Sequence, residues 1–383
     1  MVRRVVALLT GLALLAGCSA DPASPAPTAP VPDAKPVAKI TADPAPAAKN
    51  VEVTKAVTVR IADGELDTVA LTNPQGKQVE GEFAADRRSW HTTEDLGFGK
   101  SYSYAAKGTG TDGKPVQLAG KFTTVSPAST IRATVNPVDD AVVGVGMPIS
   151  VKFDRPPADR AAAEKALAVE TSPTEVEGSW AWIKPTQVDW RPKQYWPAHT
   201  KVKVSANLYG VKYGDGAYGK ADVTSEFAIG RNQVVKVHTP DHEMNVYRDG
   251  AKVASYPSSN GRDADPNLNT PNGTLIVMTR EPVGDFSNPR YGYTNVKKKW
   301  SVRISNHGEY IHENEENAAN IGKANTSHGC VNLREDDAKA YFDSALIGDP
   351  VEITGSKAKM PRTSDVFDWL IPWSEWQAMS ALR

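Results

Sequence analysis

The sequence predicts a mainly β chain: two consecutive β-sandwich domains, then a β-rich domain with a few helices and a C-terminal tail. Three observations lead to this prediction. Short runs of alternating apolar and polar residues, bounded by Gly, Asp, Asn or Pro, recur from residue 51 to about residue 230. No long helical period interrupts them. Beyond residue 230 the strand pattern continues, and one run of good helix formers, EDDAKAYFDSAL, follows it.

The start of the chain predicts an exported protein. The basic residues 1–4 are followed by the almost wholly apolar residues 5–16, a signal-peptide pattern that is too short for a stable membrane span. Residues 1–18 end in LAGC, which resembles a bacterial lipobox, so we expect Cys18 to carry lipid and to hold the protein at the outer face of the cell membrane. A plain signal peptide with a chance cysteine is the alternative. Residues 19–50 are rich in Pro and Ala and are expected to form a disordered linker.

Residues 51–125 and 126–230 are each predicted to form a β-sandwich of immunoglobulin-like type. The first contains strand-like runs such as AVTVRIADG and QLAGKFTTV, and the second contains GMPISVKFD and TKVKVSANLYG. The run RAAAEKALAV, residues 160–169, has helical character and is expected to form one short helix between strands.

The remaining residues divide into a β-rich domain, residues 231–356, and a C-terminal subdomain, residues 357–383. The tail contains Trp369, Trp373 and Trp376, so we expect it to pack back on that domain. The polar stretch from about residue 280 to residue 299 is long for a simple connection, and long loops are often lids over an active site.

Charge and cysteine content narrow the function. The chain has 44 Lys and Arg against 45 Asp and Glu, so nothing favours nucleic acid as a partner. An exported chain normally uses its cysteines in pairs, but this chain has only two, Cys18 and Cys330. With Cys18 assigned to lipid, Cys330 has no disulfide partner. Chemistry is the usual reason to keep a bare thiol in an oxidising compartment.

Cys330 stands in the segment SHGCVN, residues 327–332, which supplies features that a thiol nucleophile needs. Gly329 leaves room for a substrate carbonyl, and a turn into the following helix would aim backbone N–H groups at the sulfur and at a developing oxyanion. A base is also required, and His328 and His312 are both candidates. A histidine on a neighbouring strand can be oriented independently of the cysteine, which favours His312.

The spacing of these residues resembles the signature of L,D-transpeptidases with the YkuD-type catalytic domain. That signature is a histidine followed, after a spacer, by Ser/Thr-His-Gly-Cys-x-Asn; here His312 precedes Cys330 by 18 positions. TPNG, residues 270–273, and WLIPW, residues 369–373, are also similar to the family. The resemblance covers the chain from about Gln233 onwards. The two preceding sandwiches and the lipobox match the larger, multi-domain lipoprotein members.

The resemblance implies a role for each matching position. Cys330 would be the acylated nucleophile and His312 the general base, with the backbone carbonyl of Glu313 fixing the tautomer of the imidazole. The N–H groups of Gly329 and Cys330 would form much of the oxyanion hole. The remaining positions that would shape the site or contact substrate are His328, Ser327, Asn332 and Tyr293. For Tyr293 the match is looser, because its spacing to Trp300 differs by one residue from the family's pattern.

The implied activity is acyl transfer on peptidoglycan stem peptides in the cell wall or periplasmic space. A tetrapeptide stem would acylate the cysteine and release D-Ala, and the side-chain amine of a second stem would complete a 3→3 cross-link. Carbapenems would acylate the same cysteine, and neither a cofactor nor a metal is expected. The alternatives are an L,D-carboxypeptidase, an enzyme that attaches a protein to the wall, or a non-enzymatic cell-wall-binding module.

Overall fold

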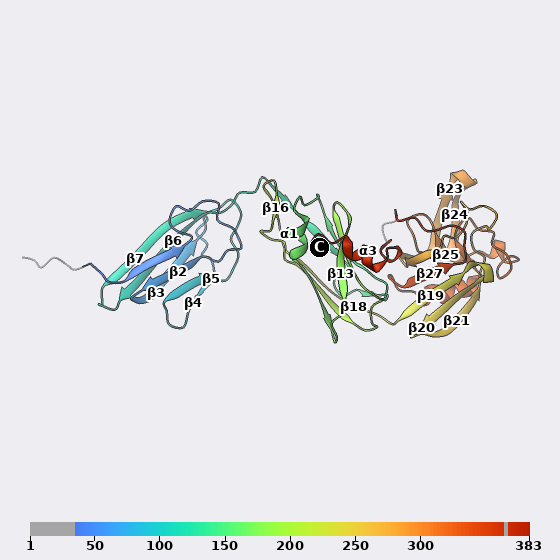
Figure 1. Cartoon of the computed structure of the whole chain (residues 1–383), viewed down its shortest axis with the longest axis horizontal. Coiled ribbons are helices and arrows are strands. Elements are labelled where there is room, and N and C mark those ends of the chain that lie inside the picture. Colours follow the sequence, from blue (N-terminus) through green and yellow to red (C-terminus); the bar gives the residue numbers. More distant parts are fainter. Residues whose placement is uncertain (1–34, 364–366) are drawn as a thin grey trace, which may run out of the picture.

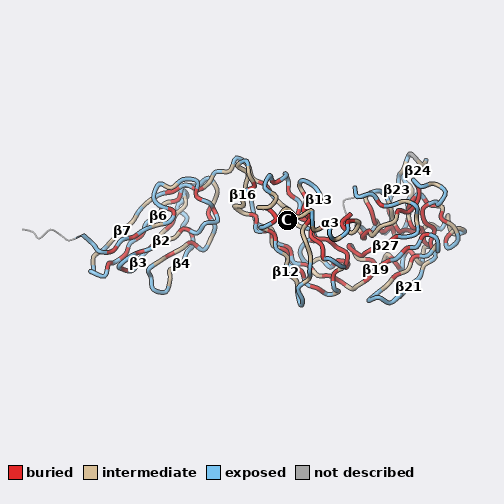
Figure 2. The backbone as a smooth tube through the Cα atoms, viewed as in Figure 1, coloured by how far each residue is buried: buried red, intermediate tan, exposed pale blue. Residues whose placement is uncertain are grey.

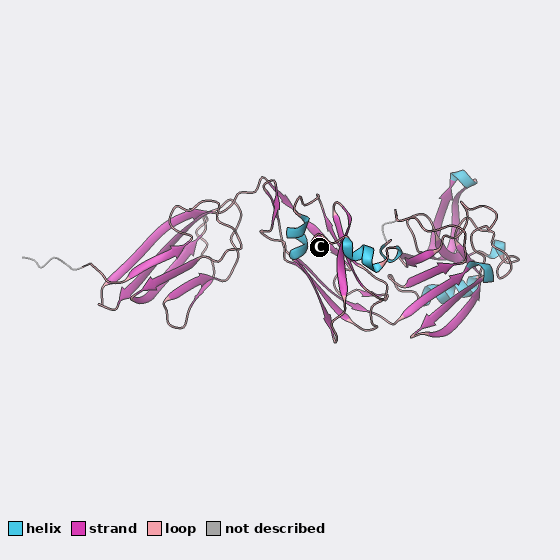
Figure 3. Ribbon diagram, in the orientation of Figure 1, coloured by secondary structure: helices cyan, strands magenta, loops and turns pink. Residues whose placement is uncertain are grey.

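The computed structural model describes residues 35–363 and 367–383, which form three β-rich bodies in a row (Figure 1). The mainly β prediction is confirmed, since the helices are few and short (Figure 3). The predicted signal peptide, the lipobox residue Cys18 and the linker up to residue 34 lie outside the described residues. Among the helices of the described part, none combines the length and the apolar character that crossing a bilayer requires.

The first body is a sandwich of two antiparallel sheets. Its strands are β1 Lys39–Asp43, β2 Thr58–Ala62, β3 Gly64–Thr72, β4 Gly81–Phe83, β5 Ser89–Thr92, β6 Ser101–Gly110 and β7 Pro115–Thr123. One sheet has the order β1-β2-β5-β4 and the other β3-β6-β7. Leu66, Trp90 and Phe122 are buried in the core of this sandwich.

The linker that was predicted to reach residue 50 is wrong for residues 39–43. These residues form β1, which pairs along its whole length with β2, from Lys39 opposite Ala62 to Asp43 opposite Thr58. Ala38 and Ile40 are buried in the core and Ala42 packs against it, so alternate residues of this Pro-rich segment attach it to the sheet.

The second body is also a sandwich, with orders β10-β18-β15-β12 and β13-β14-β11-β9 and a small sheet β16-β17-β8. Its elements are β8 Ser129–Ile131, β9 Ala133–Asn136, β10 Val142–Val143, β11 Ile149–Phe153, α1 Arg160–Lys165, β12 Leu167–Ser172, β13 Gly178–Lys184, β14 Gln187–Pro192, β15 Lys201–Ala206, β16 Lys212–Gly214, β17 Ala217–Gly219 and β18 Val223–Ile229. The expected helix is confirmed as α1, and the Asp159 carboxylate accepts the N–H of Ala162 at its start, 2.8 Å away. The helix ends before Leu167, because that residue begins a strand paired with β15.

The third body holds two sheets around one core, with orders β21-β20-β19-β27-β22 and β23-β24-β25-β26. Its elements are β19 Gln233–His238, η1 Thr239–Asp241, β20 Glu243–Arg248, β21 Ala251–Pro257, β22 Gly273–Ile276, β23 Thr279–Asn288, η2 Pro289–Tyr291, β24 Tyr293–Arg303, β25 Tyr310–Glu313, η3 Glu315–Asn317, β26 Val331–Leu333, α2 Glu335–Ser344 and β27 Pro350–Thr354. Figure 2 shows how burial follows the sheets of each body. The helix predicted after Cys330 is confirmed as α2.

The stretch from residue 280 to residue 299 is a long β-hairpin, so its prediction as a loop is wrong. β23 and β24 pair from Thr279 opposite Arg303 to Asn288 opposite Tyr293. Its strands carry many polar and charged side chains because much of the hairpin is exposed to solvent on both faces, which hides the apolar alternation expected of a strand. In Figure 1 the hairpin projects away from the rest of the third body.

The C-terminal tail crosses from the third body to the second. Its elements are η4 Asp368–Leu370 and α3 Trp373–Ala378. Leu370 packs against the core of the third body, as expected, but α3 lies on β13 of the second sandwich, where Trp376 is fully buried against Ala181. The indole N–H groups of Trp369 and Trp376 donate to the carbonyls of Gly146 and Ser179 at 2.7 and 2.8 Å. The tail therefore ties the two bodies together.

Two carboxyl groups are buried where this tail meets the second body: Asp189 of β14 and Asp368 of η4. Burial raises the pKa of Asp368 to about 6, and burial together with the charge of Asp368 raises the pKa of Asp189 well above its ordinary value. The guanidinium of Arg191 lies 4.6 Å from the Trp369 ring centre and donates to the Ile371 carbonyl at 2.8 Å. The pair therefore retains a proton at pH values at which free aspartates have lost theirs.

Substituting Asp368→Asn should remove this proton requirement. A folded-state pKa that is raised contributes stability below the unfolded pKa of about 3.9, and that contribution is lost as the pH rises through about 6. We expect the melting temperature of the variant, relative to the wild type, to rise between about pH 4 and pH 7. Glu375→Gln, at an exposed residue of the same tail, is the control and should show no such trend. An equal response of both variants to pH would contradict the shared proton.

Candidate active site

Two neighbouring parallel strands carry the predicted nucleophile and base. His312 lies on β25, and Cys330 directly precedes β26, with Ile311 opposite Val331 and His312 opposite Asn332. Ile311 and Val331 are fully buried in the core of the third body. Because side chains alternate along strands, His312, Cys330 and Asn332 face the other way. All three line one cavity of about 350 Å³.

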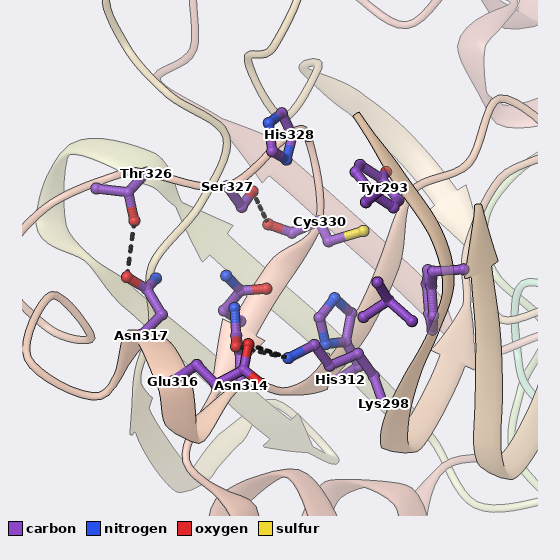
Figure 4. A pocket seen from close by; sticks show the side chains of 13 residues that line it. Tyr293, Lys298, His312, Asn314, Glu316, Asn317, Thr326, Ser327, His328 and Cys330 are labelled. Atoms are coloured by element: carbon purple, nitrogen blue, oxygen red, sulfur yellow. Dashed lines mark hydrogen bonds and ion pairs between the residues drawn. The ribbon is translucent and has the colours of Figure 1, made fainter. Parts of the chain in front are cut away.

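The cavity lies between the β23–β24 hairpin, β25 and the segment before β26 (Figure 4). Phe286, Tyr293, Val296 and Lys298 of the hairpin form one wall. The opposite side comes from the segment that runs from Asn314 to Cys330 and includes Ser327 and His328. The arrangement brings together residues that are up to 46 positions apart in the chain, from Phe286 to Asn332.

The imidazole of His312 has a defined tautomer. Its Nδ1–H donates to the backbone carbonyl of Glu313 at 2.6 Å, which leaves Nε2 without a proton and able to accept one. The Glu313 carboxylate is engaged elsewhere, since it accepts the N–H groups of Lys299 and Glu315 at 3.0 and 3.2 Å. The ring of Phe286 lies 5.0 Å from the imidazole and limits its rotation.

The nucleophile and base are both neutral at rest. Burial lowers the pKa of His312 to about 4, and the charge of Lys298 adds to this effect, while the hydrogen bond to Glu313 opposes it. The protein around the sulfur raises the pKa of the Cys330 thiol to about 12, although part of the side chain is open to the cavity and the N–H of Tyr310 acts in the opposite direction. The thiol donates to the Gly308 carbonyl, 3.6 Å away, and makes no hydrogen bond to His312.

The turn before Cys330 is held by Ser327 rather than left open for substrate. The Ser327 hydroxyl accepts the N–H of Gly329 at 3.1 Å and donates to the carbonyl of Cys330 at 2.6 Å. Gly329 has φ +124°, a backbone conformation that a residue with a Cβ rarely adopts. The expected oxyanion donor Gly329 N–H is therefore already bonded. Of the two predicted donors, the N–H of Cys330 is the one with no partner in the described part of the chain.

The expectation that the turn into the following helix aims its N–H groups at the sulfur is wrong. β26 comes between them, and α2 begins at Glu335. The first turn of α2 therefore does not aim its N–H groups at the sulfur. The sequence hides this because VNL is a strand of three residues, too short to show a period.

The tip of the β23–β24 hairpin reaches over His328. The ring centres of Tyr291 and Tyr293 lie 5.2 and 5.5 Å from that of His328. Tyr293 lines the cavity. Burial raises the pKa of its phenol, and the neighbouring Cys330 raises this pKa further. The structure thus places both Tyr293 and His328 at the mouth of the site, with His328 largely exposed to solvent.

The structure adds three polar residues or contacts that sequence reasoning did not foresee. Lys298, the middle residue of three consecutive lysines, is buried against the cavity. Its ammonium donates to the side-chain oxygen of Asn314 at 2.9 Å. The side-chain oxygen of Asn332 is buried without a hydrogen-bond partner in the described chain. Only strand alternation in KKKW, applied to a recognised hairpin, would have singled out Lys298.

Comparison with known proteins agrees with this geometry. A family model for the "L,D-transpeptidase catalytic domain" matches residues 232–353, and one for the "Bacterial Ig domain" matches residues 48–212. L,D-transpeptidase 5 of Mycobacterium tuberculosis is 42% identical over 354 residues, which cover 91% of this chain and 78% of that protein. The chain belongs to the L,D-transpeptidase family.

Two further L,D-transpeptidases are similar to this chain. L,D-transpeptidase 2 of Mycobacterium tuberculosis is 35% identical over 90% of this chain and 85% of that protein. The crystal structure of L,D-transpeptidase 3 from Mycobacterium tuberculosis, in complex with a faropenem-derived adduct, is 29% identical and matches 58% of this chain and 97% of that chain with a TM-score of 0.48. The transpeptidase is thus an acyltransferase of a family in which a cysteine nucleophile is typical, and its N-terminal part is immunoglobulin-like.

Proposed function

We propose that the protein forms 3→3 cross-links between peptidoglycan stem peptides, with Cys330 as nucleophile and His312 as general base. The observation that carries this proposal is the shared cavity. It holds a thiol, an imidazole whose Nε2 is free to accept a proton, and a buried Asn332 oxygen without a partner in the described chain. The Asn332 oxygen suits an N–H of the donor stem, because a buried acceptor without a partner costs about 1–3 kcal/mol.

In the first half-reaction, the sulfur attacks the carbonyl of the third residue of a tetrapeptide stem. The neutral resting pair means that proton transfer from sulfur to His312 Nε2 accompanies the attack, after the thiol turns away from the Gly308 carbonyl. The N–H of Cys330 stabilises the oxyanion. The imidazolium then gives its proton to the leaving D-Ala amine, and a thioester remains.

In the second half-reaction, the side-chain amine of another stem attacks the thioester. His312 accepts the proton from this amine and passes it to the sulfur as the C–S bond breaks, so Cys330 leaves as the thiol and the imidazole is neutral again. Phe286, Val296 and Tyr293 line the cavity and limit the access of water, which would otherwise hydrolyse the thioester. Carbapenems would acylate Cys330 by the same attack on a carbonyl. Lipid on Cys18 would hold the enzyme at the outer face of the membrane, within reach of the wall.

The product formed from purified disaccharide tetrapeptides tests the proposed reaction. We expect a cross-linked dimer that lacks one D-Ala, detected by mass spectrometry, and one D-Ala released per cross-link. Tripeptide as the sole product would instead identify an L,D-carboxypeptidase. A wall-protein acceptor that is used when stem acceptors fail would identify an attaching enzyme, and binding of the wall without any product would identify a binding module.

A further inference from the structure

Three consecutive lysines lie on β24 beside the active site, and only the middle one faces inward. Lys297 and Lys299 are exposed on the outer side of the strand and pair with the carboxylates of Asp285 and Glu335 at 2.5 and 2.7 Å. Lys298 lines the cavity and is only 8% exposed. Strand alternation therefore selects one ammonium from a run of three and places it near the imidazole of His312, whose pKa it affects.

The buried ammonium of Lys298 has a weakly held anionic partner. It donates to Asn314 at 2.9 Å and to the carboxylate of Glu316 at 3.3 Å. The Glu316 side chain is 88% exposed, so water hydrates its carboxylate in addition to the contact with the ammonium. Three donors face two partners in the described part of the chain. A buried cation in a reaction cavity, paired with a carboxylate that water can readily take over, is well suited to receive a different carboxylate.

We propose that Lys298 binds a free carboxylate of the donor stem peptide, which takes the place of Glu316. The inference rests on the proposed function and names the part of the substrate that the site recognises. Two carboxylates lie within one residue of the reacting carbonyl. One is the terminal carboxylate of the leaving residue, and the other is a side-chain carboxylate where the third residue is a diamino diacid. Both would reach a cation that lines the same cavity as Cys330.

Binding at this position would also act on the base. The ammonium of Lys298 disfavours a proton on His312, which keeps the imidazole neutral in the free enzyme. A substrate carboxylate beside the ammonium would compensate its charge, so the imidazolium that forms during attack becomes less costly. Lys298 would therefore favour attack on stems that carry the carboxylate, in addition to holding them.

Donor stems that differ in a single carboxylate test the proposal. Release of the fourth residue is measured with the free stem, the stem amidated at its terminal carboxylate, which releases D-alaninamide, and the stem amidated at its third-residue side chain. For the wild type, we expect amidation of the recognised carboxylate to lower kcat/KM roughly 10- to 100-fold, in part through KM. Whichever stem shows the loss identifies the source. Equal kcat/KM for all three stems would overturn the proposal.

The variant Lys298→Met should lose this discrimination, reacting with the free stem about as slowly as with the amidated one, and Lys298→Arg should restore part of it. Lys297→Met, next to it on the outer side, is the matched control and should discriminate like the wild type. Discrimination by Lys298→Met equal to that of the wild type would refute the assignment. If Lys298→Met does not fold, Glu316→Gln replaces it: loss of the competing carboxylate should lower KM for the free stem only, and an unchanged KM counts against the proposal.

Two measurements separate this inference from the proposed function. Alkylation of Cys330 by iodoacetamide, an uncharged probe, reports the thiol of the wild type without any carboxylate, and the control Lys297→Met should be alkylated at the same rate. If the wild type releases no D-Ala from the free stem, the proposed function itself fails. If it releases the fourth residue from every stem at the same rate, only the role of Lys298 fails.

Discussion

Replacing Cys330 with alanine should abolish transpeptidation and the covalent adduct with a carbapenem. The reaction requires a thioester, and no other described residue that lines the cavity carries a thiol. The loss of kcat/KM should be at least about 10⁴-fold, because the variant retains substrate binding but no covalent route. Intact-protein mass spectrometry after a carbapenem pulse measures the adduct, and D-Ala release measures turnover.

The substitution tests chemistry rather than folding. Cys330 is only half-buried and its sulfur makes one long contact, to the Gly308 carbonyl, so its removal should change the melting temperature little. Cys330→Ser preserves a donor to that carbonyl and should be equally inactive, because a hydroxyl is a far weaker nucleophile beside a neutral imidazole. Cys18→Ala is the matched control, since Cys18 is the second of the two cysteines, and it should still take up one carbapenem. An adduct on Cys330→Ala would exclude Cys330 as the nucleophile.

Replacing His312 with glutamine should lower kcat/KM by roughly 10²- to 10⁴-fold, the usual contribution of a general base. The amide can fill the space of the ring and still donate to the Glu313 carbonyl, but it cannot accept the thiol proton. His328→Gln is the comparison, because its imidazole also lies at the cavity but is largely exposed. Equal losses in the two variants, measured by D-Ala release, would contradict the assignment of the base to His312.

The pH profile of the wild type tests the neutral resting pair. A base whose pKa is about 4 and a thiol whose pKa is about 12 both keep their resting forms from about pH 6 to pH 9. We therefore expect kcat/KM to be nearly constant in that range and to fall only as the pH approaches 4, where His312 gains a proton. A rise or fall with a midpoint between pH 6 and pH 8 would instead indicate a thiolate–imidazolium pair.

The sequence alone was enough to identify Cys330 and His312 as candidates. A lone cysteine in an exported chain, with SHGCVN around it and a histidine 18 positions earlier, predicts the nucleophile, the base and the strand that presents the base. These features are local or depend on spacing. The alternating runs likewise predict the sandwiches, because every second residue of a strand with one buried face is apolar. Where a strand is exposed on both faces, as in the β23–β24 hairpin, the pattern disappears and the prediction of a loop is wrong.

What the tertiary structure decided is how the groups affect one another. The pKa values of His312 and Cys330 depend on burial by segments far away in the sequence, which leaves both groups neutral at rest. The hydrogen bond from the Gly329 N–H to the Ser327 hydroxyl occupies one of the two expected oxyanion donors. In the tail, α3 packs on the second sandwich, while Leu370 of η4 packs on the core of the third body. The sequence alone determined which atoms are expected to react. Packing decided the protonation states of His312 and Cys330, the direction in which the Lys298 side chain points and the path of the tail. All three depend on neighbours that only the folded chain brings together.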